Sequence, residues 1–219
     1  MSLQLGYACI NMTLQHEEKV QCNRGMIKRT FMAKGLPYAS ELALINVKGL
    51  KRVIEWNNAN GIKVYRMTSC LFPWFSEYDM FYLPDIDQIA DVMAEAGKLA
   101  MDAGQRLSFH PGPFNVLASP NNNVVIKTIK ELNDHSMQMD LMGLPVSPMA
   151  KINIHVGGAY GEHDKSLARF CENFKRLDPN TQARLTVEND DKANLYSTKM
   201  LVEGVSNRVG VPVVFDSHH

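Results

Sequence analysis

The sequence lacks the features of membrane proteins, of secreted proteins and of proteins with paired cysteines. No apolar run approaches the ~20 residues of a membrane span, and the N-terminus lacks the basic segment and long apolar stretch of a signal peptide. The four cysteines are scattered without a CxxC pair, as is typical of reduced thiols. We therefore expect an intracellular protein, in the cytoplasm or nucleoid, with no membrane partner.

An overall charge of one sign is also missing. The chain has 23 basic and 23 acidic residues, so it lacks the positive charge that many nucleic-acid-binding proteins carry over their whole surface. Any site for a polyanion would have to be a local basic patch.

Short apolar segments alternate with amphipathic ones along the whole chain. This alternation predicts parallel βαβ units with right-handed crossovers. In the helix at 46–61, Asn46 is the expected N-cap and Gly61 the expected stop. The expected strands are 3–11, 62–69, 106–112, 150–158, 183–190 and 211–219, and the expected helices are 46–61, 85–104, 123–143, 164–177 and 196–210.

Two architectures use this alternation, the doubly wound open sheet and the TIM-type (β/α) barrel. The segment after the first strand has neither GxGxxG nor GxxxxGK[ST], which argues against a nucleotide cofactor. We therefore predict a single α/β domain over residues 1–219, a TIM-type barrel truncated after the sixth strand, with the last two βα units missing. Open barrel edges would favour a homo-oligomer.

Residues of metal-ligand type stand at the ends of the last four expected strands. They are His110, His155, Glu188, and the pair Asp216 and His219. One histidine at a strand end is more often a hydrogen-bonded structural residue, but a packing role gives no reason for four such placements. Because strand ends meet at one mouth of a barrel, we expect a mixed nitrogen and oxygen site for divalent zinc, manganese or iron.

Two further segments carry patterns with open interpretations. The segment Cys22–Gly35 could bind a phosphate backbone and an exposed base, or could be a solvated loop. Its basic residues, with Phe31 between them, are Arg24, Lys28, Arg29 and Lys34. The aromatic segment Ser69–Pro84 could be a stacking platform or a packed lid, and packing is the expectation for Phe72 and Phe75. Three further histidines, His16, His135 and His163, are expected to be exposed to solvent.

Several motifs together resemble the UV-damage endonuclease family in order and spacing. They are "LGYACIN", "YRMTSCLFPW", "SFHPG", "INIHVGG", "TVEND" and "VVFDSHH". Members of this family resemble endonuclease IV and belong to the xylose-isomerase-like barrels. The resemblance implies a cluster of divalent metal ions, with manganese favoured over zinc, cobalt or magnesium. It implies one metal at His110, His155 and Glu188, a second at Glu188 and Asp216, and a third at His219.

The resemblance also implies residues that contact DNA. Tyr7 and Asn11 match family residues near the damaged nucleotides, and Glu77 falls where some members carry a histidine near the scissile phosphate. Relatives carry a Gln-Tyr pair that probes the lesion, where this chain has Pro113 and Phe114. Pro113 has no side-chain amide to offer and Phe114 has no hydroxyl, so the range of lesions is expected to differ.

The function implied is hydrolysis of the phosphodiester bond 5′ to UV photoproducts in double-stranded DNA. The catalytic residues would be Glu188, His155 and Glu77. In the family, further strands follow the sixth, so we expect this chain to be a fragment of marginal stability and poor catalysis. The alternatives are a metal-dependent sugar isomerase or epimerase on the same barrel, and a truncated homologue that binds DNA without cutting it.

Overall fold

The computed structural model describes residues 3–192 and 194–218. The chain divides into two compact units, Met1–Phe109 with Gln138–Pro145, and His110–Met137 with Val146–His219. Each unit contains one three-stranded parallel sheet and its own helices. Among the described residues, no helix combines the length and apolar character needed to cross a membrane.

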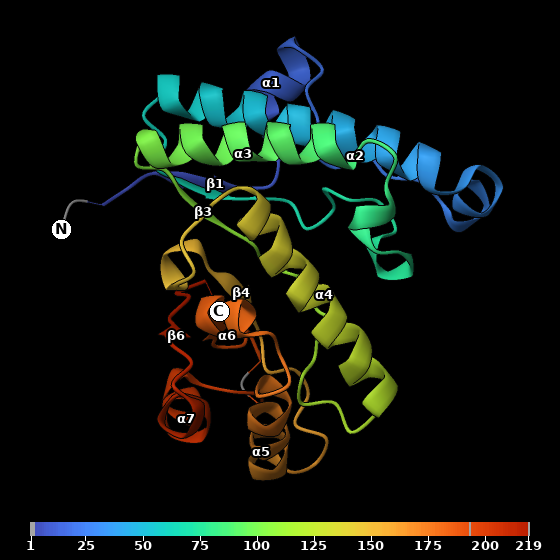
Figure 1. Ribbon diagram of the computed structural model, residues 1–219. Coiled ribbons are helices and arrows are strands. Elements are labelled where there is room, and N and C mark those ends of the chain that lie inside the picture. The colour runs from blue at the N-terminus through green and yellow to red at the C-terminus, as the bar shows by residue number, and fades with distance from the viewer. Residues whose placement is uncertain (1–2, 193, 219) are drawn as a thin grey trace. The chain divides into compact units, whose positions relative to one another are not determined.

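The first unit has a sheet in the order β1-β2-β3, with α2 and α3 lying side by side along it (Figure 1). Tyr65 on the central strand pairs with Tyr7 on one side and Leu107 on the other. The strands and helices are β1 (Gly6–Ala8), α1 (Met12–Glu17), α2 (Lys28–Ala59), β2 (Val64–Arg66), the 3₁₀ turns η1 (Phe75–Glu77) and η2 (Met80–Tyr82), α3 (Ile86–Asp102) and β3 (Arg106–Ser108).

Helix α2 begins eighteen positions before the expected helix at 46–61. Its two helical stretches meet at Gly35, which has the left-handed φ of 61°. The apolar positions that predicted the helix are buried, namely Val47, Leu50, Val53 and Ile54. Asn46 is not the N-cap. It is fully buried in the middle of α2, where its side chain bonds the backbone of Arg24 and the Leu71 carbonyl.

The second unit has a sheet in the order β4-β5-β6, in which Ile154 pairs with Val187 and Glu188 with Val214. Helix α4 (Asn122–Leu141) runs through both units. The other elements are the 3₁₀ turn η3 (Pro148–Ala150), β4 (Ile152–Ile154), α5 (His163–Phe174), α6 (Pro179–Arg184), β5 (Leu185–Glu188), α7 (Thr198–Leu201), the π-helical turn η4 (Val202–Ser206), α8 (Asn207–Val209) and β6 (Val213–Val214).

The predicted alternation of parallel strands and helices is confirmed. All six expected strands are present, although each is only two to four residues long. The expected strands are longer than the observed ones, because the chain leaves the sheet after a few residues. The polar groups described below lie in the segments that follow the observed strands or at their last residue. The closed barrel, its truncation after the sixth strand, and association through open edges stay predictions, because the two sheets belong to separate units.

One expectation about the histidines is wrong. His135 lies on α4 and is 1% exposed, with its Nδ1 2.7 Å from the Glu131 carbonyl oxygen. Burial lowers the pKa of His135, and the hydrogen bond to the carbonyl opposes this only in part. The amphipathic period of α4 places position 135 on its inner face, which the polar character of histidine obscured.

Candidate metal centre

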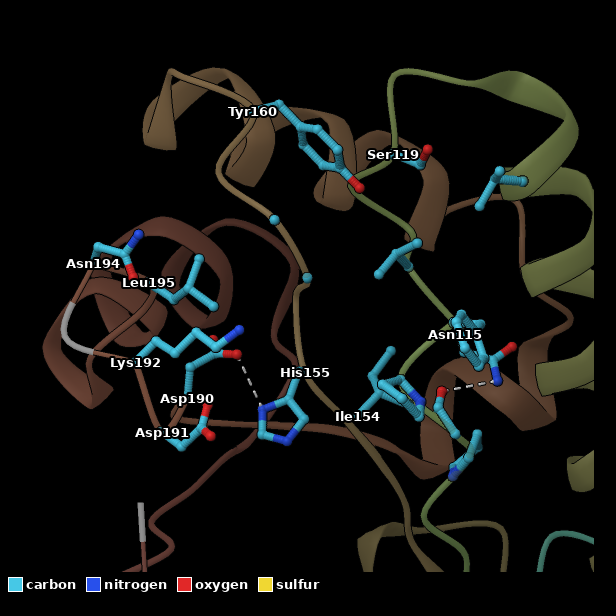
Figure 2. A pocket seen from close by; sticks show the side chains of 18 residues that line it. Asn115, Ser119, Ile154, His155, Tyr160, Asp190, Asp191, Lys192, Asn194 and Leu195 are labelled. Carbon is cyan, nitrogen blue, oxygen red and sulfur yellow. Dashed lines mark hydrogen bonds and ion pairs between the residues drawn. The ribbon is translucent and has the colours of Figure 1, made fainter.

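A cavity of about 840 Å³ opens in the second unit between three loops (Figure 2). One loop contains Pro111–Val116, the second follows β4, and the third follows β5. His155 and Asp190 lie on its wall and are joined by a dashed line in Figure 2. The cavity therefore borders the residues that the sequence predicts as metal ligands.

Three of those predicted residues are brought together by the strand ends. His155 follows β4 directly, Glu188 is the last residue of β5, and His110 stands two residues after β3. Strands β4 and β5 are parallel neighbours, so their carboxyl ends lie at the same edge of the sheet. The apolar strand residues before these positions are buried and hold the polar residues at that edge.

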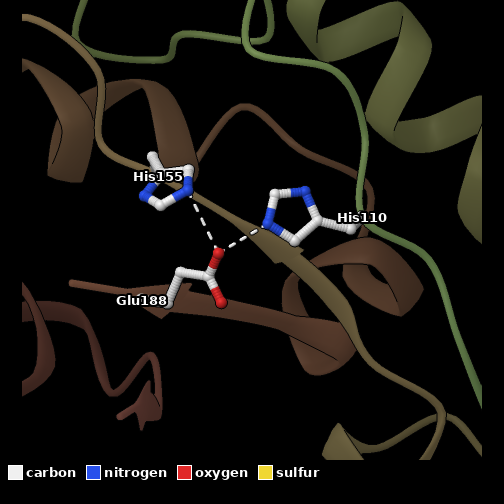
Figure 3. A group of neighbouring side chains, drawn as sticks. All are labelled: His110, His155 and Glu188. Atoms are coloured by element: carbon white, nitrogen blue, oxygen red, sulfur yellow. Dashed lines mark hydrogen bonds and ion pairs between the residues drawn. The ribbon is translucent and has the colours of Figure 1, made fainter. Parts of the chain in front are cut away.

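The ligand atoms of His110, His155 and Glu188 all lie within 4.8 Å of one another (Figure 3). One carboxylate oxygen, Glu188 Oε1, is 2.6 Å from His110 Nε2 and 3.1 Å from His155 Nε2. Metal–ligand bonds of about 2.0–2.2 Å place neighbouring ligand atoms roughly 3–3.5 Å apart. A slight opening of this group would thus give two nitrogens and one oxygen the spacing that a divalent cation requires.

Both imidazole rings have an oxygen beside their other nitrogen. His110 Nδ1 is 3.2 Å from the Pro111 carbonyl oxygen, and His155 Nδ1 is 3.4 Å from Asp190 Oδ1. A cation at the shared point would take the place of the Nε2 protons that now face Glu188, while the acceptor beside each Nδ1 would keep a proton on that nitrogen. This arrangement suits metal ligation, in which the Nε2 atoms of both rings bind the same ion.

Glu188 is held by two strands at once. Asn153 on β4 donates a hydrogen bond from Nδ2 to Glu188 Oε2, and Thr186 Oγ1 donates to Asn153 Oδ1 at 2.6 Å. All three residues are buried. The carboxylate therefore has a fixed orientation, with Oε2 used by the amide and Oε1 facing the histidines.

Electrostatics keeps this buried carboxylate ionised. Burial alone would raise the pKa of Glu188, but hydrogen bonds from His110 and His155 outweigh it, and the pKa lies well below the usual range. The same contact with Glu188 raises the pKa of His155 against the opposing effect of burial. A buried negative charge facing two imidazoles is a suitable environment for a cation.

Asp216, another predicted ligand, is not part of this group. Asp216 has its backbone bonded to the side chain of Asn189, which donates to the Asp216 carbonyl at 3.0 Å and accepts from its N–H at 2.9 Å. Among the described residues, the metal-ligand group contains His110, His155 and Glu188 and does not include Asp216. His219 lies outside the described residues.

Tyr7 and Asn11, predicted to lie near damaged nucleotides, contact each other in the first unit. Asn11 Nδ2 donates to Tyr7 Oη at 2.9 Å, and Tyr7 Oη donates to Asn57 Oδ1 at 2.7 Å. Asn11 also caps α1 by accepting from the Leu14 N–H. Both side chains are thus held in place, and burial raises the pKa of the Tyr7 phenol.

The basic segment Cys22–Gly35 is ordered and anchored to the aromatic segment that follows β2. Trp74 Nε1 donates to the Met26 carbonyl at 2.6 Å, and the Phe31 ring stacks on the rings of Trp74 and Tyr78. Phe31 therefore packs within the protein. The basic side chains project from this anchored backbone, with Arg24, Lys28, Arg29 and Lys34 all exposed.

The aromatic segment itself is largely packed. Phe72 and Phe75 are buried and their ring centroids are 5.3 Å apart, as expected for a packed lid. Glu77 is exposed at the end of η1 and accepts a hydrogen bond from Ser76 at 3.3 Å. Glu77 belongs to the first unit, and its predicted part in catalysis stays a prediction.

Pro113 and Phe114 lie on the first loop of the cavity in the second unit. Both are exposed, and Phe114 as a residue is 88% exposed. The next residue, Asn115, is buried and donates from Nδ2 to Glu131 Oε1 at 2.8 Å, which ties this loop to α4. An apolar ring held in solvent by an anchored loop is suited to stacking against a partner molecule.

Sequence reasoning missed Asn153 and Asp190 as parts of the site. The period of two in an extended chain offered a signal for both, because Asn153 precedes His155 by two positions and Asp190 follows Glu188 by two. Side chains at such positions lie on the same side of the strand and its extension. Tyr160, which also lines the cavity, had no comparable signal.

The chain is similar in sequence to known proteins. The chain is 35% identical over 219 residues to the UV-damage endonuclease of Schizosaccharomyces pombe, covering 99% of this chain and 36% of that protein. It is 33% identical over 174 residues to the UV DNA damage endonuclease of Bacillus velezensis, covering 80% of this chain and 52% of the relative. The chain thus spans only part of the length of these relatives.

A solved structure is similar over nearly the whole chain. The crystal structure of SacUVDE aligns with a TM-score of 0.86 and 30% sequence identity, covering 99% of this chain and 70% of that one. The α/β fold with short parallel strands is therefore shared with it. The sequence model of the UV-endonuclease UvdE family matches residues 3–219, and the chain belongs to that family.

Proposed function

We propose that this chain is a DNA-repair endonuclease that hydrolyses the phosphodiester bond 5′ to UV photoproducts in double-stranded DNA. It would use divalent metal ions, manganese first, with zinc, cobalt and magnesium as alternatives. The observation that carries the proposal is the convergence of His110, His155 and Glu188, with ligand atoms within 4.8 Å of one another. Membership of the UV-endonuclease UvdE family supports DNA as the substrate.

The residues of the group would have distinct parts in this reaction. His110 and His155 would each offer Nε2 to the cation, because their Nδ1 atoms face Pro111 and Asp190 oxygens. Glu188 would offer Oε1, while Asn153 holds its other oxygen. A bound divalent cation would supply charge that polarises the phosphodiester and makes water a better nucleophile near neutral pH.

The first unit would supply affinity for the DNA backbone. Arg24, Lys28 and Arg29 are exposed on an anchored segment and form no ion pair with another described residue, which suits contact with phosphates. Contacts with phosphates do not depend on the base sequence of the DNA. Selectivity would come from the lesion, since photoproducts stack and pair poorly and cost less to displace than normal bases.

The test is a strand-nicking assay on an end-labelled duplex that carries one thymine dimer, with manganese added. Incision directly 5′ to the dimer is expected. It should be absent from the undamaged duplex, absent with EDTA, and absent with His155→Ala. Incision that is equal on damaged and undamaged duplexes, or that persists in EDTA, would contradict the proposal.

A second candidate is a chain that binds DNA without cutting it. The observation that favours it is that, among the described residues, the metal-ligand group contains His110, His155 and Glu188 and no further carboxylate. Metal stoichiometry distinguishes the two functions, since a binding protein with only the His110, His155 and Glu188 group would hold one ion. Binding of the dimer duplex without incision, at one metal per chain, would establish this alternative.

A further inference from the structure

The loop that follows β4 presents a tyrosine with an unusual backbone. Tyr160 has a φ of 49°, in the left-handed region, and its side chain is 48% exposed. Gly157 and Gly161 on either side also have positive φ, 100° and 82°. A left-handed backbone costs a side-chain-bearing residue free energy that glycine avoids. Such strain in a loop beside a candidate active site points to a use for the ring.

Buried side chains hold this loop in place from behind. Ser166 is fully buried and donates to the Ala159 carbonyl at 2.7 Å, and buried Tyr196 donates to the Gly158 carbonyl at 3.4 Å. Arg169 donates to Ser166 Oγ at 2.8 Å. The guanidinium carbon of Arg169 lies 5.6 Å from the centroid of the Tyr160 ring, within range of a cation–π contact.

The loop also approaches the opposite wall of the cavity closely. A Cβ at Gly157 would lie 2.4 Å from Val116 Cγ1, so only glycine allows this approach. Val116 lies on the same loop as Phe114, and its N–H donates to Thr128 on α4 at 3.2 Å. The backbone segments that carry Phe114 and Tyr160 are therefore held close to each other in the structure without a ligand.

The chemistry of the cavity indicates its ligand. Tyr160 lies on the upper wall with its ring directed toward Ser119, and His155 and Asp190 lie below it (Figure 2). The polar floor contains two carboxylates, Asp190 and Asp191, with Lys192 the adjacent cation. Carboxylates accept hydrogen bonds from the N–H groups of a base and repel phosphate. The volume of about 840 Å³ is within the range for small ligands.

We propose that Tyr160 is a binding residue that stacks on an unpaired nucleobase of the DNA substrate inside this cavity. The base would enter beside His155, while its phosphate remains at the group formed by His110, His155 and Glu188. The hydrogen bonds that hold the backbone of this loop mean that less of the loop has to be ordered on binding. This inference rests on the proposed function, since it assumes a DNA substrate, and it adds the residue that holds the displaced base.

The experiment measures binding by fluorescence anisotropy in EDTA, so that no incision occurs, with the full 219-residue chain. Two labelled duplexes are compared, one with a thymine dimer and one with abasic residues at the same positions and at the positions opposite them. Stacking of one base on an aromatic ring predicts that Tyr160→Leu weakens binding of the dimer duplex by about tenfold. Tyr160→Phe, which keeps the ring, should bind within about twofold of the unchanged chain.

The abasic duplex separates stacking from a structural effect. It offers no base to Tyr160, so all three proteins should bind it equally. The inference would be overturned if Tyr160→Leu lost the same affinity for both duplexes, or lost no affinity for the dimer duplex. It would also be overturned if the unchanged chain did not bind the dimer duplex. In the strand-nicking assay with manganese described above, normal incision by a Tyr160→Leu chain whose binding is also unchanged would reject the inference alone. Tyr160-dependent binding without incision by the unchanged chain would reject the proposed endonuclease activity alone.

Discussion

The Nδ1 atom of His155 lies 3.4 Å from Asp190 Oδ1, while its Nε2 atom lies 3.1 Å from Glu188 Oε1. His155 is thus placed between two carboxylates, one in the candidate cation site and one behind the ring. A carboxylate behind a metal-binding histidine fixes the tautomer and orientation of the ring and raises its basicity. Asp190 is in this sense a positioning residue.

Replacement of Asp190 by asparagine should weaken metal binding without removing a ligand. The amide can still contact His155 Nδ1, but it lacks the charge that favours the ligating tautomer. We expect the affinity for Mn²⁺ to fall about 10- to 100-fold, the range for such second contacts, as measured by isothermal titration calorimetry. Glu172→Gln, which changes an exposed carboxylate on α5, is the matched control and should bind Mn²⁺ normally.

Metal binding should also stabilise the fold. An ion that binds only the folded chain adds about 2.7 kcal/mol to the free energy of unfolding at 100 times its Kd. Addition of Mn²⁺ should therefore raise the melting temperature of the unchanged chain in differential scanning fluorimetry. His110→Ala should abolish this rise, whereas His16→Ala, which changes an exposed histidine on α1, should preserve it. A rise of equal size in His110→Ala would place the ion elsewhere.

The sequence predicted the site well where strand ends carry the chemistry. His110, His155 and Glu188 follow short buried apolar segments, and parallel strands place such positions at one edge. The order of strands and helices followed from the same periodicity. The period of two places Asp190 on the same side of the chain as Glu188, but its contact with the His155 ring joins segments 35 positions apart and has no local signal.

Asn46 illustrates the limit of local reasoning. Asparagine before an amphipathic run is a typical N-cap, yet α2 extends through it, because the segment before it is also helical. The amide instead satisfies the backbone of Arg24, a partner 22 residues away that no local pattern reveals. His135 was misjudged for a similar reason, since its partner carbonyl and apolar surroundings appear only after α4 packs.

The buried position of Asn46 gives a stability prediction. Asn46→Ala would leave the Arg24 N–H and the Arg24 and Leu71 carbonyls without this partner. An unsatisfied buried polar group costs about 1–3 kcal/mol, so the free energy of unfolding in urea should fall by about 2–3 kcal/mol. Trypsin should also cleave faster after Arg24. Asn60→Ala, at an exposed residue after α2, should change the unfolding free energy by less than about 1 kcal/mol.

His135 gives a prediction about pH. Its pKa is lowered in the folded chain by burial, so below about pH 6.5 the unfolded chain binds more protons at this residue. The free energy of unfolding should therefore fall as pH drops from 7.5 to 5.5, by at most about 1.4 kcal/mol per pH unit for one group. Urea unfolding in EDTA should show a weaker pH dependence in His135→Gln than in His16→Gln. Equal pH dependence in both variants would contradict a neutral buried His135.

The basic segment gives a prediction about salt. Each lysine or arginine that contacts a DNA phosphate releases counterions, so removing one lowers the slope of log K against log salt by about 1. Lys28→Gln and Arg29→Gln should each weaken binding of damaged and undamaged duplexes by the same factor, because phosphate contacts carry no information about the lesion. Lys199→Gln, which changes a side chain that is 81% exposed on α7, is the control and should leave the slope unchanged. A loss confined to damaged DNA would instead mean that Lys28 or Arg29 contacts the lesion itself.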